Sequence, residues 1–275
     1  MNRDFRNSRR ILFALLVSLS ALSLSQTAPQ STAADNVFRI HPLHPVDELR
    51  KEALAAQPPK ESGHFRKPEL VELVKLDPTI KLDIRYATDR NFLSTPMYSQ
   101  ARAFLQRPAA DALLRAHQAL RAKGYGLLIH DAYRPWYVTK MFWDATPQDK
   151  KIFVADPKEG SRHNRGCAVD LTLYDLKTGK SIDMPSLYDE MSQRAYANYP
   201  GGTEEERRHR VLLRTAMEAQ GFTVYPQEWW HFDYKDWRHY PIMNVRFEDI
   251  HTTEPSTDSQ RPAFDPSTPV IARGR

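Results

Sequence analysis

Residues 161–174 read Ser-Arg-His-Asn-Arg-Gly-Cys-Ala-Val-Asp-Leu-Thr-Leu-Tyr, and this segment is among the most informative parts of the chain. From Val169 onward apolar residues occupy every second position, which is the period of a half-buried β-strand with Asp170 on its polar face. Gly166 favours a turn that brings His163 and Asp170 toward one point. A carboxylate in a strand that is otherwise suited to burial needs a partner, and a cation is the natural one.

A second segment, Glu-Trp-Trp-His at residues 228–231, completes a candidate metal site. Two His residues and Asp170 can hold a zinc ion and leave one coordination position open for water. The carboxylate of Glu228 is then free to act as a base. Residues three apart face opposite sides of a regular strand, so we predict a bend, a bulge or a single helical turn between Glu228 and His231.

The first 34 residues have the order of a secretory signal peptide. A basic start is followed by an uncharged apolar run at residues 11–25 and then by small residues. The run is short and rich in Ser for a membrane span, and an uncleaved N-terminal anchor is the alternative. We therefore expect an exported protein, periplasmic or extracellular, that is not inserted in the membrane after cleavage.

Charge and cysteine content narrow the class of protein further. The formal net charge of +5 falls to about +2 without residues 1–34, which gives no indication of nucleic acid as a partner. The single cysteine, Cys167, excludes an intramolecular disulfide framework. Stability must come from an ordinary core, for which 41% hydrophobic residues suffice.

Composition divides the remaining chain into three parts. Residues 35–66 are rich in Pro and Ala and are predicted to be a linker or N-terminal extension with one short helix at 46–54. Residues 67–250 form the predicted folded domain. Residues 251–275 carry Pro, Ser and Thr without an apolar period, which is typical of a disordered tail.

Apolar periodicity predicts the elements of this domain. We expect strands at 70–76, 80–86, 127–132, 169–174 and 222–225, and helices at 108–123, 135–143 and 204–220. The inner face of the last helix is predicted to comprise Val211, Leu212, Thr215, Ala216 and Ala219. Strands and helices do not alternate regularly, so we predict an α+β domain with a central, mostly antiparallel sheet flanked by helices and a zinc site at the sheet.

The motifs Ser-x-His-x-x-Gly-x-Ala-x-Asp and Glu-x-Trp-His resemble those of the zinc D-alanyl-D-alanine dipeptidase family, the VanX-type branch of a group that includes zinc D,D-carboxypeptidases. Residues 83–92, 131–135 and 184–191 are also similar to segments of that branch, and the resemblance runs from about residue 70 to 234. It implies a D,D-peptidase or Hedgehog-like fold and one zinc ion per chain.

The resemblance also implies a role in catalysis for five matched residues. His163, Asp170 and His231 would be the zinc ligands. Glu228 would be the catalytic base and later the acid. Arg134 would hold the oxygen of the tetrahedral intermediate.

Three further matched residues would bind the substrate. Asp189 would bind its free ammonium, Ser161 would help at that end, and Tyr86 would line the pocket. Cys167 stands where a small residue such as Ser is commoner in the family, and we expect this departure to have little effect on activity.

The implied function is zinc-dependent hydrolysis of the D-Ala-D-Ala dipeptide to two D-alanines by metal-activated water, in an exported protein that acts in cell-wall turnover. The nearest alternative is a zinc D,D-carboxypeptidase or endopeptidase that acts on peptidoglycan stem peptides. Two more distant alternatives are a thiol hydrolase that uses Cys167 and a non-catalytic wall-binding module. The sequence leaves the oligomeric state open.

Overall fold

The computed structural model describes residues 37–250, which all belong to one structural unit of the chain. The predicted signal peptide and the predicted tail lie outside the described residues, so both stay predictions. Within residues 37–250 no helix is long and apolar enough to span a bilayer.

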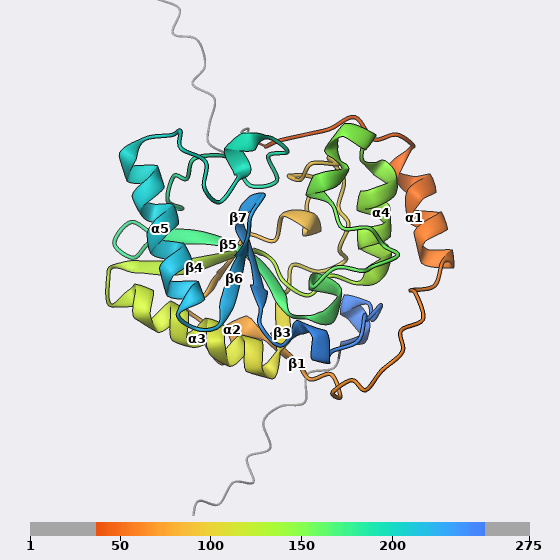
Figure 1. Ribbon diagram of the computed structural model, residues 1–275, viewed down its shortest axis with the longest axis horizontal. Helices are drawn as coiled ribbons and strands as arrows, with labels where there is room; N and C mark the ends of the chain where they lie inside the picture. Colours follow the sequence, from red (N-terminus) through yellow and green to blue (C-terminus); the bar gives the residue numbers. More distant parts are fainter. Residues whose placement is uncertain (1–36, 251–275) are drawn as a thin grey trace, which may run out of the picture. The chain divides into compact units, whose positions relative to one another are not determined.

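The centre of the fold is a five-stranded sheet with the strand order β2-β4-β5-β7-β6 (Figure 1). Only the β2–β4 pair is parallel, and the other three pairs are antiparallel. The strands are β2 (Lys81–Leu82), β4 (Tyr125–Asp131), β5 (Ala168–Asp175), β6 (Phe222–Tyr225) and β7 (Glu228–Tyr234). A separate antiparallel pair consists of β1 (Leu70–Glu72) and β3 (Phe104–Gln106). The predicted α+β fold with a mostly antiparallel sheet is confirmed.

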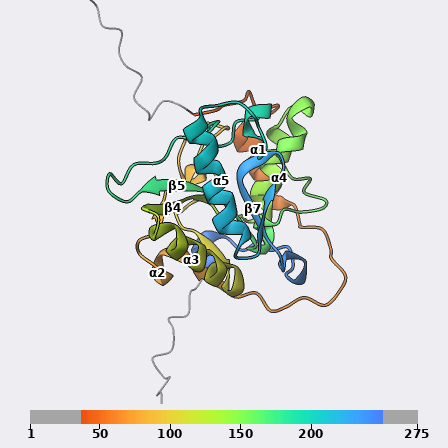
Figure 2. The same cartoon turned by 60° about the vertical axis from the view of Figure 1, so that its left-hand side comes forward.

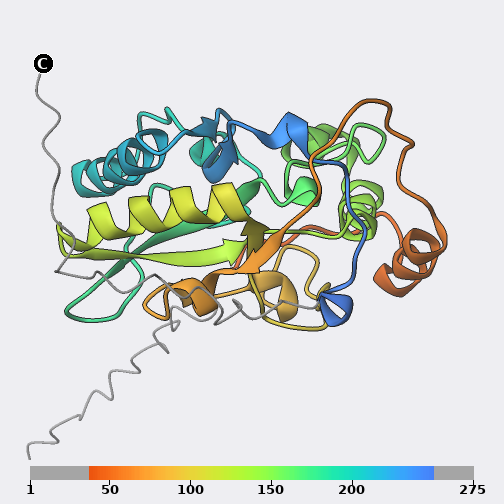
Figure 3. The same cartoon turned by 90° about the horizontal axis from the view of Figure 1, so that it is seen from below.

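Two long helices, α3 (Arg107–Arg121) and α5 (Glu204–Glu218), cover one face of this sheet, as Figures 2 and 3 show from two sides. Pro108 lies in the first turn of α3, where its missing N–H costs nothing. A capping box, in which Thr203 and Glu206 satisfy each other's backbone N–H groups, begins α5. These local signals place both helices close to where the sequence predicts them.

The helices α1 (Val46–Ala55) and α4 (Trp136–Ala145) pack side by side at one end of the sheet (Figure 1). Leu49 and Ala53 of α1 are buried in the main core, although they belong to the predicted N-terminal extension. The remaining short elements are α2 (Leu73–Leu76), η2 (Arg85–Ala87), η3 (Gln148–Phe153), η4 (His163–Arg165), η5 (Gln193–Ala195), η6 (Trp237–His239) and η7 (Phe247–Asp249).

The register of three neighbouring strands brings charged residues into one row across the sheet. Asp170 of β5 lies directly opposite His231 of β7. On its other side Asp170 faces Asp131 of β4, because the β4–β5 register shifts by one residue between Ile129 and Asp131. Cross-strand partners project side chains to the same face, so this row concentrates charge at one place.

The turn before β5 is the one that the sequence predicts. The short helix η4 ends at Gly166, whose φ of 66° lies in the left-handed region. A Cβ atom at this position would lie 2.7 Å from Leu70 Cδ2, so only glycine fits without a shift. This turn places His163 beside Asp170.

Three details of the sequence prediction are wrong. The expected strand 70–76 is only three residues long before α2 begins, and the expected strand 80–86 is two residues long. The strand β5 is buried on both faces rather than half-buried, and Asp170 is inside the domain. Alternation within one strand cannot reveal whether the second face of that strand is covered.

The predicted inner face of α5 is right only in part: Leu212 and Ala216 pack against the core, whereas Thr215 and Ala219 are exposed. Val211 is 57% exposed, whereas Leu213 is fully buried. The buried stripe of α5 comprises His209, Arg210, Leu213 and Met217. Two of its members, His209 and Arg210, are polar, so a pattern of apolar residues alone does not predict this stripe.

The corrected face of α5 can be tested with two neighbouring substitutions. Leu213→Ala is expected to lower the free energy of unfolding by about 2–5 kcal/mol, because it leaves a cavity under the helix. Val211→Ala is the matched control and is expected to change it by about 0.5 kcal/mol or less. Urea denaturation of both variants measures the difference, and equal losses would contradict the observed face.

Candidate metal centre and active site

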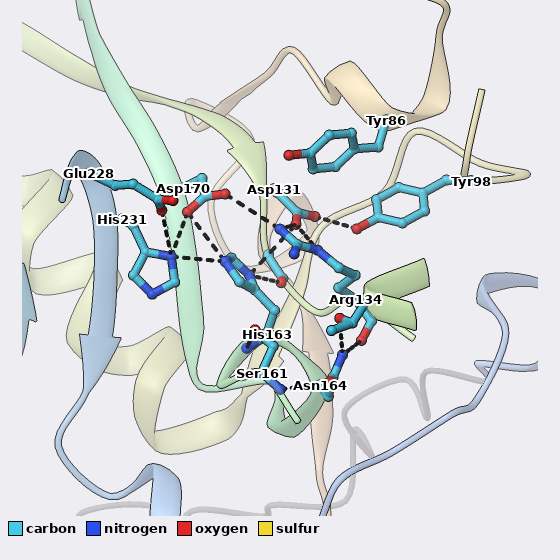
Figure 4. Close-up of polar contacts among 12 residues, drawn as sticks. Tyr86, Tyr98, Asp131, Arg134, Ser161, His163, Asn164, Asp170, Glu228 and His231 are labelled. Carbon is cyan, nitrogen blue, oxygen red and sulfur yellow. Dashed lines mark hydrogen bonds and ion pairs between the residues drawn. The ribbon is translucent and has the colours of Figure 1, made fainter. Parts of the chain in front are cut away.

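Three side chains converge at the sheet and could together hold a metal ion: His163, Asp170 and His231 (Figure 4). The Nε2 atom of His163 and the Nδ1 atom of His231 lie 3.1 Å apart. The Asp170 Oδ1 atom is 3.3 Å from the former nitrogen and 3.0 Å from the latter. All three residues are buried.

These distances fit a small tetrahedrally coordinated cation. Ligand atoms at the usual zinc distances of about 2.0–2.1 Å are about 3.3 Å from one another in a tetrahedron, close to the observed triangle. The buried Oδ1 atom of Asp170 has no hydrogen-bond partner of acceptable geometry among the described residues. Its second oxygen accepts a hydrogen bond from the Tyr188 hydroxyl at 3.0 Å. The residues present therefore suit a divalent metal.

The charge state of Asp170 is also appropriate for a metal ligand. Burial on its own raises the pKa of this carboxyl group. The two imidazoles that face it outweigh burial and hold its pKa well below the ordinary value. Asp170 is thus the one anionic member of the triangle.

Glu228 lies beside this triangle, with its Oε2 atom 3.7 Å from His231 Nδ1. The register between β6 and β7 is irregular there: Tyr225 pairs with Glu228, while Val224 pairs with Phe232. This irregularity is the predicted bulge, and it lets residues three apart reach one site. Burial raises the pKa of Glu228 to about 7, although His231 acts in the opposite direction.

Arg134 is fixed by a buried network on the opposite side of the site. Its Nε and Nη2 atoms both donate to Asp131 Oδ2, at 2.9 and 2.8 Å. The hydroxyl of Tyr98 donates to the other Asp131 oxygen at 2.7 Å. The guanidinium group also lies over the neighbouring rings of Tyr86 and Phe142, 5.3 and 4.8 Å from their centroids.

This network leaves Arg134 able to meet a ligand. Its Nη2 atom is 3.8 Å from Asp170 Oδ2, so the cation lies next to the candidate metal site. Its Nη1 atom has no hydrogen-bond partner among the described residues. A rigid cation with a free donor is suited to stabilise negative charge that develops on a bound molecule.

Asp189 lies at the other end of the site in a strained backbone conformation, with a φ of 61°. Its Oδ1 atom accepts a hydrogen bond from the Tyr86 hydroxyl at 2.9 Å, and its buried Oδ2 atom has no partner among the described residues. Burial and the nearby charge of Asp170 raise the pKa of Asp189 well above its ordinary value. This carboxyl group lacks a cation, and strain of this kind is typical of ligand-binding positions.

A cavity of about 100 Å³ connects these groups. Its walls include all eight residues to which the resemblance assigns a role: Tyr86, Arg134, Ser161, His163, Asp170, Asp189, Glu228 and His231. Ser161 also accepts a hydrogen bond from the backbone N–H of His163 at 3.2 Å. The small volume suits a short ligand.

The structure gives no support to a thiol mechanism. Cys167 is fully buried and is absent from the cavity walls within the described residues. Burial also raises the pKa of its thiol, whereas a nucleophilic cysteine needs a lowered one.

Sequence reasoning assigned no role to four residues that support the site: Tyr98, Asp131, Tyr188 and Asp233. Asp131 was visible in the segment Asp-Ala-Tyr-Arg-Pro, three residues before Arg134. The two tyrosines lie far from their partners in sequence, so no local pattern points to them. Asp233 follows His231 by two residues, the spacing that puts both on one face of a strand.

Comparison with known proteins assigns the chain to a family. The family model described as D-Ala-D-Ala dipeptidase, peptidase family M15, matches residues 66–252. The D-alanyl-D-alanine dipeptidase of Escherichia coli (strain K12) is 36% identical over 179 residues, which cover 65% of this chain and 91% of that protein. The D-alanyl-D-alanine dipeptidase of Enterococcus faecium is 35% identical over 178 residues, which cover 57% and 87%.

A solved structure of an LD-carboxypeptidase is a more distant match. It is 19% identical, with a TM-score of 0.38, and the match covers 74% of this chain and 88% of that one. The likeness is too remote to bear on the function.

Proposed function

The chain belongs to the D-Ala-D-Ala dipeptidase family of metal-dependent peptidases, and on that premise we propose that it hydrolyses the D-Ala-D-Ala dipeptide to two D-alanines with one bound zinc ion. The observation that carries the proposal is that the metal triangle and three further residues line one small cavity. The candidate metal triangle lies between Glu228 and Arg134, and the unpaired carboxyl group of Asp189 marks one end.

Zinc fits the two imidazoles and one carboxylate, and when bound it would lower the pKa of a water molecule and polarise a carbonyl group. His163, Asp170 and His231 would hold it. Asp170 supplies a single negative charge, so a divalent ion would keep a net positive charge at the site.

The chain's own residues supply the proton transfers and stabilise the charge. Glu228 accepts a proton from the attacking water and then delivers it to the leaving nitrogen. Its raised pKa, about 7, suits both steps near neutral pH. Arg134 is held rigidly by Asp131 and faces the oxygen that becomes negative in the transition state.

The choice between a dipeptide and a longer peptide depends on Asp189. Its buried Oδ2 atom has no partner, and a free substrate ammonium would give it a charge-assisted hydrogen bond. An acylated amine carries no positive charge and would leave this carboxyl group unpaired. This geometry favours a dipeptidase over a carboxypeptidase or endopeptidase that acts on stem peptides.

We further propose that the protein is exported and acts in cell-wall turnover. The support is the order of basic, apolar and small residues within positions 1–34. Outside the inner membrane the dipeptide would come from wall material.

The role of Glu228 predicts a specific kinetic loss. Glu228→Gln and Glu228→Ala are expected to lower kcat by about 10²–10⁴-fold, because the general base is removed. Zinc content, measured by elemental analysis, is expected to stay at one per chain. Glu205→Gln, on the exposed surface of α5, is the control. Near-normal turnover in the Glu228 variants would remove this residue from the mechanism.

The role of Asp189 predicts how the enzyme treats an acylated substrate. The natural enzyme is expected to cleave D-Ala-D-Ala far faster than N-acetyl-D-Ala-D-Ala. Asp189→Asn is expected to lower kcat/KM for the free dipeptide by about 10²–10³-fold, the effect of removing one partner from a buried charge pair.

Asp183→Asn, at an exposed position six residues earlier, is the matched control for this experiment. Efficient cleavage of the acetylated substrate by the natural enzyme would favour the carboxypeptidase alternative instead.

Export can be tested by expressing the full chain and separating the cell fractions. The mature protein is expected outside the inner membrane, with its first residue near position 35 by N-terminal sequencing. Protein that stays in the cytoplasm, with residues 1–34 intact, would contradict the proposal.

A further inference from the structure

The two edges of the His231 ring face different partners. Its Nδ1 atom points toward Asp170 and His163 in the candidate metal triangle. Its Nε2 atom lies 2.8 Å from Asp233 Oδ1. A neutral imidazole carries one N–H group. Carboxylate oxygens face both ring nitrogens of His231, so a metal ion in the triangle would take the Nδ1 lone pair while Asp233 accepts the hydrogen on Nε2.

His163 has the opposite arrangement. Its Nδ1 atom lies 2.6 Å from the backbone carbonyl oxygen of Ala132, which leaves the Nε2 lone pair directed into the triangle. The backbone therefore orients one imidazole, whereas the side chain of Asp233 orients the other. Only the hydrogen bond that orients His231 can be removed by a side-chain substitution, because its partner is the side chain of Asp233.

Asp233 is itself held in place. It lies two residues after His231 on β7 and therefore on the same face of the sheet. Its neighbours across the sheet are Ala168 of β5 and Thr223 of β6, both small residues. Its Oδ2 atom is 3.5 Å from the Nε atom of Arg162, whose guanidinium lies 4.8 Å from the centroid of the Trp237 ring.

Asp233 does not reach the substrate site directly. It is absent from the cavity walls among the described residues, although both His231 and Arg162 are part of them. Asp233 contacts the cavity walls through His231 and Arg162, and of these two only His231 belongs to the metal triangle.

We propose that Asp233 is a positioning residue that selects the His231 tautomer with a free Nδ1 atom and holds the ring toward the metal. The inference rests on the proposed function only in assuming that the triangle binds a metal ion. A partner of this kind typically contributes about 10–100-fold to metal affinity. The effect should thus appear in binding, independently of peptide hydrolysis.

The test compares zinc affinities of full-chain variants by competition with a chromophoric chelator. Asp233→Ala removes the acceptor and is expected to weaken zinc binding by about 10–100-fold. Asp233→Asn keeps an oxygen acceptor of the same reach and is expected to restore most of that loss. Asp236→Ala, three residues later, breaks a surface ion pair with Arg66 and is expected to leave the affinity unchanged.

Two further measurements separate positioning from other roles. The metal-free proteins are expected to unfold at similar temperatures, since the affinity loss does not come from a damaged fold. At saturating zinc, Asp233→Ala is expected to recover kcat on D-Ala-D-Ala to within about tenfold of the natural enzyme.

Natural zinc affinity in Asp233→Ala would overturn the inference, and so would equal losses in the Ala and Asn variants. A kcat that stays low at saturating zinc would overturn it too, because it would place Asp233 in the chemistry. If the natural protein binds zinc but does not cleave the dipeptide, the proposed function fails while the affinity comparison still decides the inference.

Discussion

The carboxylate of Asp170 is buried inside the five-stranded sheet, and two imidazoles are directed at one of its oxygens. An isolated charge in such a place is strongly unfavourable, so a cation or equivalent partners must accompany it. The β5–β7 register sets His231 opposite Asp170, and the turn at Gly166 sets His163 beside it. The positions of both strands and of the loop between η4 and β5 meet this requirement.

The surrounding residues keep that arrangement rigid. Tyr188 binds the second oxygen of Asp170, and its ring stacks on buried His130. Asp131 and Tyr98 hold Arg134 on one side of the triangle, and the bulge in β7 brings Glu228 to the other. Groups that are fixed before a substrate arrives need little reorganisation during a reaction, which is the main source of electrostatic catalysis in enzymes. Two register irregularities, in β4 and in β7, therefore help to place the residues of the candidate site.

The metal triangle and Glu228 could be predicted from the sequence, because they belong to two short segments with fixed spacing. The roles of Arg134 and Asp189 followed only from the family resemblance. The bulge at Glu228 followed from geometry alone, since residues three apart cannot share one face of a regular strand. The supporting shell could not be predicted, because Tyr98 and Tyr188 reach their partners only through tertiary packing. The face of α5 was predicted only in part for a related reason: His209 and Arg210 are buried by contacts that a pattern of apolar residues does not include.

The most direct test is a crystal structure of the zinc-loaded protein with diffraction data collected at the zinc absorption edge. One anomalous peak is expected about 2.0–2.2 Å from His163 Nε2, His231 Nδ1 and an oxygen of Asp170. Glu228 should lie beside the metal without replacing any of the three. A peak at another position, or a zinc ion that binds other residues in place of these, would contradict it.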